Sequence, residues 1–474
     1  MKNLVDIRFG TSGWRAIIAE DFTFENVRLV SQAIVDYLKD NKQSEKVLIG
    51  YDTRFLSGHF SRVSAEVFAL NKIEVLLAER DTPTPAIAYH IIKQKLGGGV
   101  NFTASHNPPE YNGIKFSPSH GGPAQREVTQ SIEKGIIRLQ KSGRDIKLCS
   151  SSCNKYIKTF DPKPAYLKRL KQIVDFSCIK KAKLKIAVDC MYGTSRGYID
   201  NLLKPNVKEL VMFHDYLNPL FGGLPPEPDK PYIQDMIKHV KKNKFDLGLG
   251  CDGDADRFGI VDKGGEFLYP NDIITLLFHY LLKTRPKAAK VARTLSTTHM
   301  IDAIAAAHGI EVIETPVGFK YIGEAIQAGD CIIGGEESGG LSIQGHIPEK
   351  DGILACLLVA EMVAREKKSL VQMMSELRKK YGSFYSGRKN MHLGEKQKQI
   401  LQRKLKDLSA KQTFGDMRII SRNFTDGYKL ILENNCWVMF RPSGTEPVMR
   451  CYFEANSKKK LAYIKQLINA FVNV

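Results

Sequence analysis

The sequence predicts an α/β fold of three related units followed by a smaller α+β domain. Three segments each run from a short apolar strand through a polar turn into a helical pattern, which indicates parallel sheets with helices on both faces. They are KVLIGYDTR (46–54), LKIAVDCMYGTS (184–195) and KVARTLSTTHM (290–300). Near the C-terminus the strands YKLIL, CWVMF and RCYFEA come in series before an amphipathic helix, the pattern of an α+β domain.

Four domains are expected along the 474 residues. A chain of this length holds three or four units at roughly 100–200 residues each. The proline-containing segment CSSSCNKYIKTFDPKPAYLKRL and the glycine-rich turn DKGGEFLYPND indicate two of the boundaries. The expected domains are residues 1–155, 156–261, 262–380 and 381–474.

The chain is basic, with 70 Lys and Arg residues against 51 Asp and Glu residues and a net charge of +19. Such a balance favours either nucleic-acid binding or small anionic substrates. The lysine runs are typical of solvated helix faces, and the sequence lacks the RNP1 signature and zinc-ligand spacings of nucleic-acid-binding modules. Charge steering toward a small dianionic substrate is therefore favoured, and a basic nucleic-acid-binding protein is a remote alternative.

Cysteine usage and hydropathy indicate a cytoplasmic protein. The nine cysteines are dispersed without CxxC spacing, which argues against a disulfide framework and a structural zinc site. The N-terminus, MKNLVDIRFGTSGWR, lacks the apolar core of a signal peptide. The longest apolar run, ILACLLVA (353–360), is far shorter than the ~20 residues of a membrane span, so no membrane association is expected.

An acidic loop follows an apolar strand in FDLGLGCDGDADRFGIVD (245–262). Asp252, Asp254 and Asp256 alternate, so in an extended loop their carboxylates face one side. Carboxylates this close repel one another unless a cation lies between them, and such hard oxygen ligands suit Mg²⁺. An EF-hand would have glycine at the position of Arg257 and glutamate at that of Lys263, so this loop is not one. The segment GLGCDG (248–253) matches the GxGxxG pattern of dinucleotide sites, but the carboxylates that follow would repel the phosphates. The neighbouring Arg257 is suited to holding a phosphoryl group.

The segment TASHNPPEYNGIK (103–115) contains a candidate nucleophile, Ser105. The preceding residues read as a strand, which places Ser105 at the strand's carboxyl end, where open α/β sheets carry their chemistry. A serine hydroxyl needs a base or a metal to attack phosphorus, and His106 and Lys115 are the local candidates for proton transfer. The alternative is a polar turn built by the Asn-Pro-Pro sequence. Ser105 itself does not stand in a GxSxG elbow, which disfavours a hydrolase role for this serine.

Two further loops carry candidate binding residues. GGEESGG (334–340) presents acidic and hydroxyl side chains between glycines, which suits neighbouring sugar hydroxyls. RPSGTEP (441–447) follows a strand and has the donors of an anion-binding nest. Either loop by itself could be a plain turn.

Taken in order, these four loops resemble the signature loops of the α-D-phosphohexomutase family, over essentially the full length of the chain. TASHNP…NGIK resembles the phosphoserine loop, DGDADR the metal loop, GEESGG the sugar loop and RPSGTEP the phosphate loop; FGTSGWR resembles the N-terminal motif. The resemblance implies three α/β domains with mixed sheets and one α+β domain around a central cleft. It also implies an isomerase that interconverts hexose 1-phosphate and hexose 6-phosphate through an enzyme phosphoserine and a hexose 1,6-bisphosphate.

The same resemblance implies roles for individual residues. Ser105 would be phosphorylated and would bind Mg²⁺ together with Asp252, Asp254 and Asp256, while Lys115 would be the general acid or base, with His106 beside it. Arg15 and Arg257 would steady the transferring phosphoryl group. Glu336 and Ser338 would bind sugar hydroxyls, and Lys320 of TPVGFK would be a further candidate ligand. The phosphate of the substrate that does not react would be bound by Arg441, Ser443, Gly444 and Thr445.

The sugar loop bears on the substrate. It reads GEESGG, whereas family members that use both glucose and mannose often read GEMSGH, so glucose phosphate is the expected substrate. Phosphomannomutase and phosphoglucosamine mutase are the alternatives, and a phosphatase would result if water replaced the returning hydroxyl. The expected partners are a small sugar phosphate, Mg²⁺ as cofactor and a hexose 1,6-bisphosphate as activator, without nucleic acid or membrane, and the expected state is a monomer or dimer.

Overall fold

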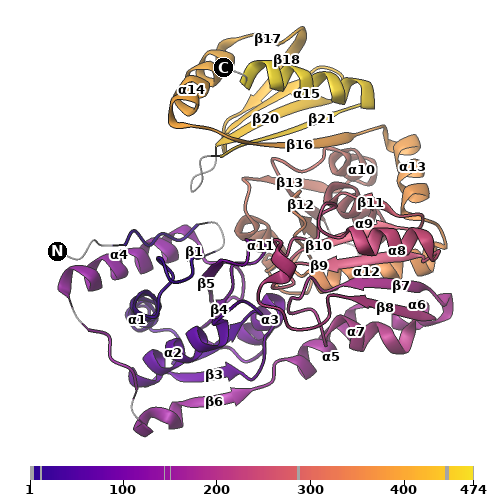
Figure 1. Cartoon of the computed structure of the whole chain (residues 1–474). Helices are drawn as coiled ribbons and strands as arrows, with labels where there is room; N and C mark the ends of the chain where they lie inside the picture. The colour runs from indigo at the N-terminus through magenta and orange to yellow at the C-terminus, as the bar shows by residue number, and fades with distance from the viewer. Residues whose placement is uncertain are drawn as a thin grey trace.

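The computed structural model describes residues 5–10, 13–143, 145–149, 151–285, 289–442 and 448–472. Within these residues the strands form four sheets in chain order, and helices pack on each of them (Figure 1). The first three sheets are mixed and the fourth is antiparallel throughout. The predicted fold class, three α/β units and a C-terminal α+β unit, is therefore confirmed.

The first sheet has the order β1-β5-β4-β2-β3-β6, in which β4, β2, β3 and β6 are parallel and β5 and β1 complete the sheet through antiparallel pairings. Helix α1 follows the predicted pattern, since Thr23 caps its first turn and Val30 and Ile34 lie on its buried stripe. The elements are β1 (Trp14–Ile17), α1 (Phe24–Asp40), β2 (Lys46–Tyr51), α2 (Ser57–Leu70), β3 (Glu74–Ala78), α3 (Thr84–Lys93), β4 (Gly98–Phe102), β5 (Tyr111–Pro118), α4 (Arg126–Ser142), the short 3₁₀ turn η1 (Ser151–Tyr156) and β6 (Ile157–Phe160).

The second sheet has the order β11-β10-β9-β7-β8, with β9, β7 and β8 parallel. Its central strand β9 is buried along its whole length and ends one residue before Asp252. The elements are α5 (Lys163–Ile173), α6 (Phe176–Ala182), β7 (Lys185–Asp189), α7 (Ile199–Leu203), η2 (Lys204–Asn206), β8 (Glu209–Phe213), η3 (Phe221–Gly223), α8 (Gln234–Lys242), β9 (Leu247–Cys251), β10 (Phe258–Asp262) and β11 (Glu266–Leu268).

The third sheet has the order β13-β12-β14-β15, in which β15 runs antiparallel to the other three strands. Strand β14 ends directly before Glu336, so the predicted sugar loop connects β14 to β15. The elements are α9 (Pro270–Thr284), β12 (Lys290–Thr294), α10 (Met300–His308), β13 (Glu311–Thr315), α11 (Phe319–Gln327), β14 (Cys331–Gly335), β15 (Leu341–Ile343), α12 (Gly352–Glu366) and α13 (Leu370–Tyr381).

The fourth sheet has the order β16-β21-β20-β19-β18-β17, and it stands beyond the third domain at one end of the molecule (Figure 1). Its elements are β16 (Tyr385–His392), α14 (Glu395–Ala410), β17 (Thr413–Phe414), β18 (Met417–Asn423), β19 (Tyr428–Leu432), β20 (Cys436–Pro442), β21 (Val448–Ala455) and α15 (Lys458–Val472).

Two of the predicted domain boundaries fall inside sheets. Strand β6 ends at Phe160 and pairs with β3, beyond the boundary predicted at residue 155. Strands β10 and β11 belong to the second sheet up to Leu268, beyond the boundary predicted at residue 261. A strand at the edge of a sheet belongs to that sheet's domain wherever the linker prolines or glycines lie, and we propose domain limits after Phe160, Leu268 and Tyr381.

The hydrophobic cores divide unequally among the domains. One large core runs through the second and third domains, each of which also has a smaller cluster of its own. The first and fourth domains have separate main cores, and a small cluster joins the fourth domain to the third. The apolar run at 353–360 lies inside the shared core as part of α12, whose residues from Gly352 to Ala364 are all buried. Among the described residues, no helix combines the length and the apolar composition that crossing a bilayer requires.

Buried polar side chains attach the fourth domain to the third. Glu454 on β21 accepts a hydrogen bond from the backbone N–H of His299 at 3.0 Å. Lys429 on β19 is 1% exposed and donates to Glu314 Oε2 at 2.9 Å, and Arg293 donates to the same oxygen at 2.6 Å. Burial and the nearby Arg293 outweigh the attraction of Glu314 and lower the pKa of Lys429 to about 8.

Because Lys429 is buried with a lowered pKa, we expect the free energy of unfolding to depend on pH. The pKa of Lys429 returns to 10.5 on unfolding, so between about pH 8 and 10.5 Lys429 is protonated in the unfolded chain and neutral in the folded one. The stability of the fold therefore increases with pH across this window, as the cost of burying the amine falls. We expect the free energy of unfolding of the wild type, minus that of Lys429→Met, to rise by up to about 1.4 kcal/mol per pH unit across this window. Urea unfolding at several pH values measures this difference in free energy, with Lys459→Met, at an exposed position, as the control. A difference between wild type and Lys429→Met that stays constant or falls as pH rises would contradict the prediction.

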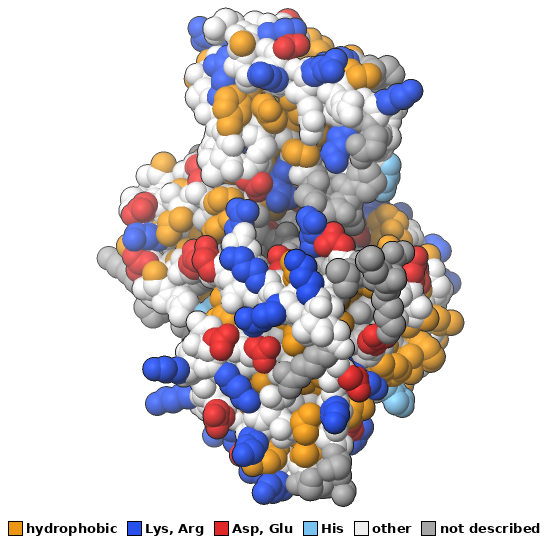
Figure 2. Space-filling view, turned by 90° about the vertical axis from the view of Figure 1, so that its left-hand side faces the viewer, with side chains coloured by type: hydrophobic (Ala, Val, Ile, Leu, Met, Phe, Trp, Pro, Cys, Tyr) orange, Lys and Arg blue, Asp and Glu red, His pale blue; other side chains and the backbone are white. Residues whose placement is uncertain are grey.

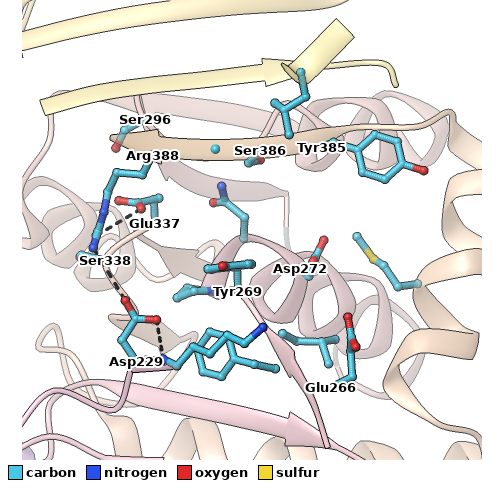
Figure 3. A pocket seen from close by; sticks show the side chains of 18 of the residues that line it. Asp229, Glu266, Tyr269, Asp272, Ser296, Glu337, Ser338, Tyr385, Ser386 and Arg388 are labelled. Atoms are coloured by element: carbon cyan, nitrogen blue, oxygen red, sulfur yellow. Dashed lines mark hydrogen bonds and ion pairs between the residues drawn. The ribbon is translucent and has the colours of Figure 1, made fainter. Parts of the chain in front are cut away.

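A cavity of about 1110 Å³ lies between the second, third and fourth domains. Figure 2 shows the molecule hollowed below the fourth domain, with Lys and Arg side chains around the hollow. Close up, Arg388 of β16 lies beside Glu337 of the β14–β15 loop, with an Nη1–Oε1 distance of 3.4 Å, and near Asp229 (Figure 3). Arg257 and Ser338 also line the cavity, so the cleft reaches both the acidic loop and the sugar loop.

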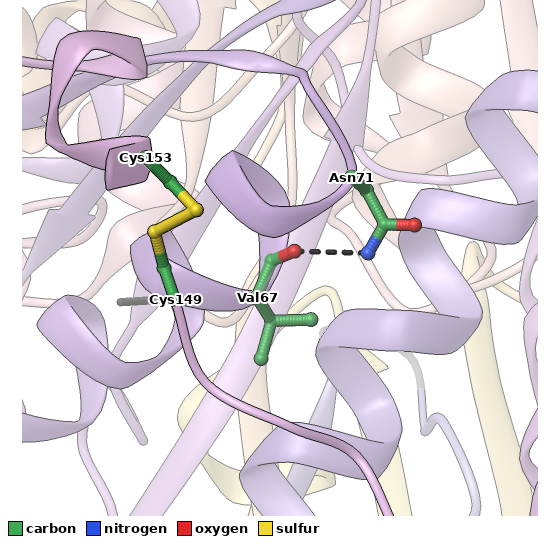
Figure 4. Close-up of a disulfide and its surroundings, with 4 residues drawn as sticks. All are labelled: Val67, Asn71, Cys149 and Cys153. Atoms are coloured by element: carbon green, nitrogen blue, oxygen red, sulfur yellow. Dashed lines mark hydrogen bonds between the residues drawn. A yellow bond between two sulfur atoms is a disulfide. The ribbon is translucent and has the colours of Figure 1, made fainter. Parts of the chain in front are cut away.

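One local disulfide departs from the cysteine expectation. Cys149 and Cys153, four residues apart between α4 and β6, are joined, and their Cα atoms are 5.7 Å apart (Figure 4). The other seven cysteines are free thiols, so within the described residues no disulfide connects distant segments. The dispersed spacing did not predict this pair because the two cysteines are brought together by the short turn η1 rather than by a CxxC motif.

Candidate active site

Ser105 lies in the turn after β4, at the sheet edge that the sequence predicts. Its side chain is fully buried, and its Oγ donates to Asp252 Oδ2 at 2.7 Å. Its backbone has a φ of 53°, a left-handed conformation that is costly for a serine and that is found disproportionately at functional sites. The hydroxyl of Ser105 is therefore in direct contact with a carboxylate of the acidic loop.

A buried arginine fixes this turn. Arg54, in the polar turn after β2, donates to the backbone carbonyls of Ser105 at 2.7 Å, of Asn107 at 2.5 Å and of Pro108 at 2.7 Å. Asp52 accepts from Arg54 Nε at 3.1 Å, and both side chains are fully buried. Neither Asp52 nor Arg54 is among the predicted site residues, although both stand in the first of the three repeated strand–turn segments.

The three aspartates form a compact buried cluster. Asp252, Asp254 and Asp256 each have a carboxylate oxygen within 4.8 Å of the others, and at most 1% of each residue is exposed. Burial and the two neighbouring carboxylates raise the pKa of Asp252 well above its usual range. Oδ1 of Asp254 and Oδ1 of Asp256 have no hydrogen-bond partner among the described residues. Buried, unpartnered and mutually repelling oxygens fit a hard divalent cation such as Mg²⁺.

Two lysines lie beside this cluster. Lys115 on β5 donates to Asp254 Oδ2 at 2.6 Å and to Asp256 Oδ2 at 2.8 Å; its burial opposes the charged form, but these carboxylates outweigh it and raise its pKa. Lys350, between β15 and α12, has its Nζ 3.1 Å from Asp256 Oδ2 and 3.0 Å from Glu349 Oε1. Lys350 is not among the predicted site residues, because it lies in a loop that only tertiary packing brings to the cluster.

His106 and two arginines complete the surroundings of Ser105. His106 Nδ1 is 3.5 Å from Ser105 Oγ, and burial, together with Arg257 and Arg15, holds the pKa of the imidazole well below its usual range. Arg15 donates to Asn107 Oδ1 at 2.7 Å, and burial followed by repulsion from Arg257 lowers its pKa to about 10. Two guanidinium groups that repel each other at a buried site would be stabilised by an anion between them.

The predicted sugar loop, between β14 and β15, is hydrogen-bonded to the segment TPVGFK (315–320). Glu336 is buried and its Oε1 accepts from the backbone N–H of Gly318 at 3.0 Å, while Ser338 Oγ donates to Glu336 Oε2 at 3.4 Å. Lys320 lies in the first turn of α11 with its Nζ 4.8 Å from the centroid of the Tyr321 ring. Among the described contacts, Lys320 makes no hydrogen bond or ion pair with Glu336 or Ser338.

The predicted phosphate loop is described in part. Arg441 lies near the end of β20, and its Nε donates to Asp426 Oδ2 at 2.9 Å. Ser443, Gly444 and Thr445 lie outside the described residues. Of the predicted site residues, one group lies together around the acidic loop: Ser105, the three aspartates, Lys115, His106, Arg15 and Arg257. Glu336 and Ser338 are hydrogen-bonded to each other in the predicted sugar loop.

Comparisons with known proteins agree with this arrangement. Four family models match in order: phosphoglucomutase/phosphomannomutase alpha/beta/alpha domain I at residues 6–142, domain II at 164–265, domain III at 269–381 and the C-terminal domain at 389–470. A "Phosphoglucomutase" of Komagataeibacter xylinus is 30% identical over 97% of this chain and 89% of that protein. A "Probable phosphoglucosamine mutase" of Pyrococcus horikoshii is 30% identical over 95% of this chain and 94% of that protein.

A solved structure agrees over the full length as well. The crystal structure of a "putative phosphomannomutase" from Thermus thermophilus superposes with a TM-score of 0.86 at 29% identity, and covers 99% of this chain and 100% of that chain. Both the order of the four domains and the long matches to these relatives lead to one conclusion: the chain belongs to the phosphoglucomutase/phosphomannomutase family.

Proposed function

We propose that this phosphohexomutase interconverts glucose 1-phosphate and glucose 6-phosphate through a phosphate carried on Ser105. The observation that carries the proposal is the 2.7 Å hydrogen bond from Ser105 Oγ to Asp252, at a buried carboxylate cluster flanked by Arg15 and Arg257. The members of the family that resemble this chain are named for glucose, mannose and glucosamine phosphates, so the choice of sugar rests on the sugar loop.

The proposed cycle has two phosphoryl transfers. The phosphorus–Oγ bond of phosphoSer105 breaks as a bond forms to the free hydroxyl of the hexose phosphate, which gives a hexose 1,6-bisphosphate. The bisphosphate turns over in the cleft and returns its other phosphoryl group to Ser105 Oγ. Arg15 and Arg257 hold the oxygens of the group in transit. Asp252, Asp254, Asp256 and the phosphate on Ser105 would hold Mg²⁺, which would neutralise charge on those oxygens. Added hexose 1,6-bisphosphate then acts as an activator, because it phosphorylates Ser105.

The proton must move in step with the phosphoryl group. When phosphoSer105 gives up the group, the attacking hexose hydroxyl releases a proton and Ser105 Oγ gains one. When Ser105 takes the group back, its Oγ releases a proton and the leaving hexose oxygen gains one. Lys115, whose ammonium form Asp254 and Asp256 stabilise, is suited to donate a proton. The imidazole of His106, kept neutral 3.5 Å from Oγ, is suited to accept one.

The substrate must be held at both ends, in either direction. Arg441, with Ser443, Gly444 and Thr445, binds the phosphate that does not react. Because this phosphate can be at either end of the sugar, these residues contact the phosphate and not the sugar ring. Glu336 and Ser338 bind sugar hydroxyls, and Lys320 is a further candidate ligand. Because the site has to accept the 1-phosphate and the 6-phosphate alike, its polar groups must read hydroxyls that occupy equivalent places in both orientations.

Comparative kinetics test the proposed substrate. We expect kcat/KM for glucose 1-phosphate to exceed that for mannose 1-phosphate by about 10-fold to 100-fold, or about 1.4 to 2.7 kcal/mol, because the two sugars differ only at the 2-hydroxyl. Glucosamine 1-phosphate is measured beside them, with the matching bisphosphate present. Equal use of glucose and mannose phosphates would remove the glucose assignment, and absence of turnover with every hexose phosphate would contradict the whole proposal.

Glu336→Gln tests the sugar loop. The amide keeps the size of the side chain but weakens charge-assisted hydrogen bonds, so kcat/KM should fall for glucose and mannose phosphates together, by roughly 1.5–3 kcal/mol of transition-state binding. Glu324→Gln on α11 makes the same chemical change outside the site and should leave both values unchanged. Wild-type kinetics in Glu336→Gln would show that the loop does not bind the sugar.

A further inference from the structure

Asp426 lies in the turn between β18 and β19 and joins two domains through one oxygen. Its Oδ2 accepts from Arg441 Nε at 2.9 Å, within the fourth domain, and from the backbone N–H of Val317 at 2.9 Å, in the third domain. The side chains of Asp426 and Arg441 are 25% and 17% exposed, so water screens their ion pair only in part. Asp426 therefore holds the arginine of the phosphate loop against the TPVGFK segment.

The next residue along extends this connection to the sugar loop. The backbone N–H of Gly318 donates to Glu336 Oε1 at 3.0 Å, so two successive amides bind two carboxylates from different domains. Gly318 has φ 138° and ψ 127°, a conformation that residues with a Cβ rarely adopt. Arg441 is thus connected to Glu336 through three hydrogen bonds and the peptide bond between Val317 and Gly318.

We propose that Asp426 is a positioning residue that fixes Arg441 for the substrate phosphate and sets its place relative to Glu336. The inference rests on the proposed function, in which Arg441 binds the non-reacting phosphate and Glu336 binds the sugar. A long arginine side chain loses rotational freedom when it is ordered by a ligand, and an aspartate that orders it beforehand removes that cost from binding. Asp426 touches neither the reacting phosphorus nor Ser105 in this scheme.

Asp426→Asn tests the proposal. The variant keeps the shape but removes the charge that holds Arg441, so KM for the hexose phosphate should rise about 5-fold to 20-fold, while kcat changes less than about two-fold, because the group acts on a part of the substrate bound alike in the ground and transition states. Asp416→Asn is the matched control, since Asp416 is an exposed residue of the same domain that bonds only to Tyr463 among the described contacts. Its kinetics should equal those of the wild type.

A double-mutant cycle with Arg441→Ala separates positioning from a general structural effect. If Asp426 acts through Arg441, the double variant should have the KM of Arg441→Ala alone; a KM equal to the product of both single effects would overturn the proposal. Unchanged KM in Asp426→Asn, with a raised KM in Arg441→Ala, would overturn this inference and leave the phosphate site intact. Unchanged KM in Arg441→Ala would instead refute the phosphate-binding role assigned under the proposed function, and the inference with it.

Discussion

Ser105→Ala should reduce mutase turnover by at least about 10⁴-fold, since it removes the atom that carries the phosphoryl group between the two transfers. Intact-mass analysis of the wild type should show a species about 80 Da heavier than the unmodified chain, the mass of one phosphoryl group on serine, and the variant should lack it. Incubation with hexose 1,6-bisphosphate should increase this species in the wild type alone.

Ser64→Ala is the control for Ser105→Ala. Ser64 is also a fully buried serine of the first domain, but its Oγ hydrogen-bonds to Ser31 Oγ at 2.9 Å, away from the acidic loop. It should retain both turnover and the heavier species. Wild-type turnover in Ser105→Ala would show that the reaction does not pass through this serine.

Asp254→Asn should lower Mg²⁺-dependent turnover by at least about 10³-fold, because it removes one of three charged ligands and weakens the hold on Lys115. Calorimetric titration of the variant with Mg²⁺ alone should show a large loss of affinity, which gives a readout independent of activity. Stability should change little: the loss of repulsion from the neighbouring aspartates is offset by the weaker bonds to Lys115 and Thr84.

Asp246→Asn provides the matched control, since Asp246 precedes β9 at the end opposite the acidic loop, where it accepts from the backbone N–H of Lys185 at 2.8 Å. It should bind Mg²⁺ and turn over as the wild type does. Full wild-type activity in excess EDTA, or unchanged Mg²⁺ affinity in Asp254→Asn, would contradict a metal role for the cluster.

Local sequence patterns predicted the parts of this molecule that depend on local chemistry. The strand before Ser105, the alternation of Asp252 and Asp254 and the buried stripe of α1 each follow from residues that are neighbours in the chain. The aspartate cluster is an example: two-residue spacing in a loop was enough to expect its carboxylates on one side.

Features that depend on contacts between distant segments could not be read in the same way. Lys350 reaches Asp256 from a loop of another domain, and Arg54 holds carbonyls 51 to 54 positions away. Neither carries a local motif, because an ammonium or guanidinium group fits any surface turn equally well until the partner segment is known. The domain limits that we propose differ from the predicted ones for a related reason: an edge strand such as β6 joins its sheet through pairing with β3, which proline and glycine positions do not encode.

The continuous core of the second and third domains has a consequence for cooperativity. The two domains bury most of their apolar side chains in one shared cluster, with α12 inside it, and each has a smaller cluster of its own. Each domain would therefore lose the larger part of its core if the other unfolded. The acidic loop and the sugar loop, which project from β9 and β14, therefore belong to a single folding unit. The first and fourth domains, with cores of their own, can open locally while the separation between those two loops stays fixed.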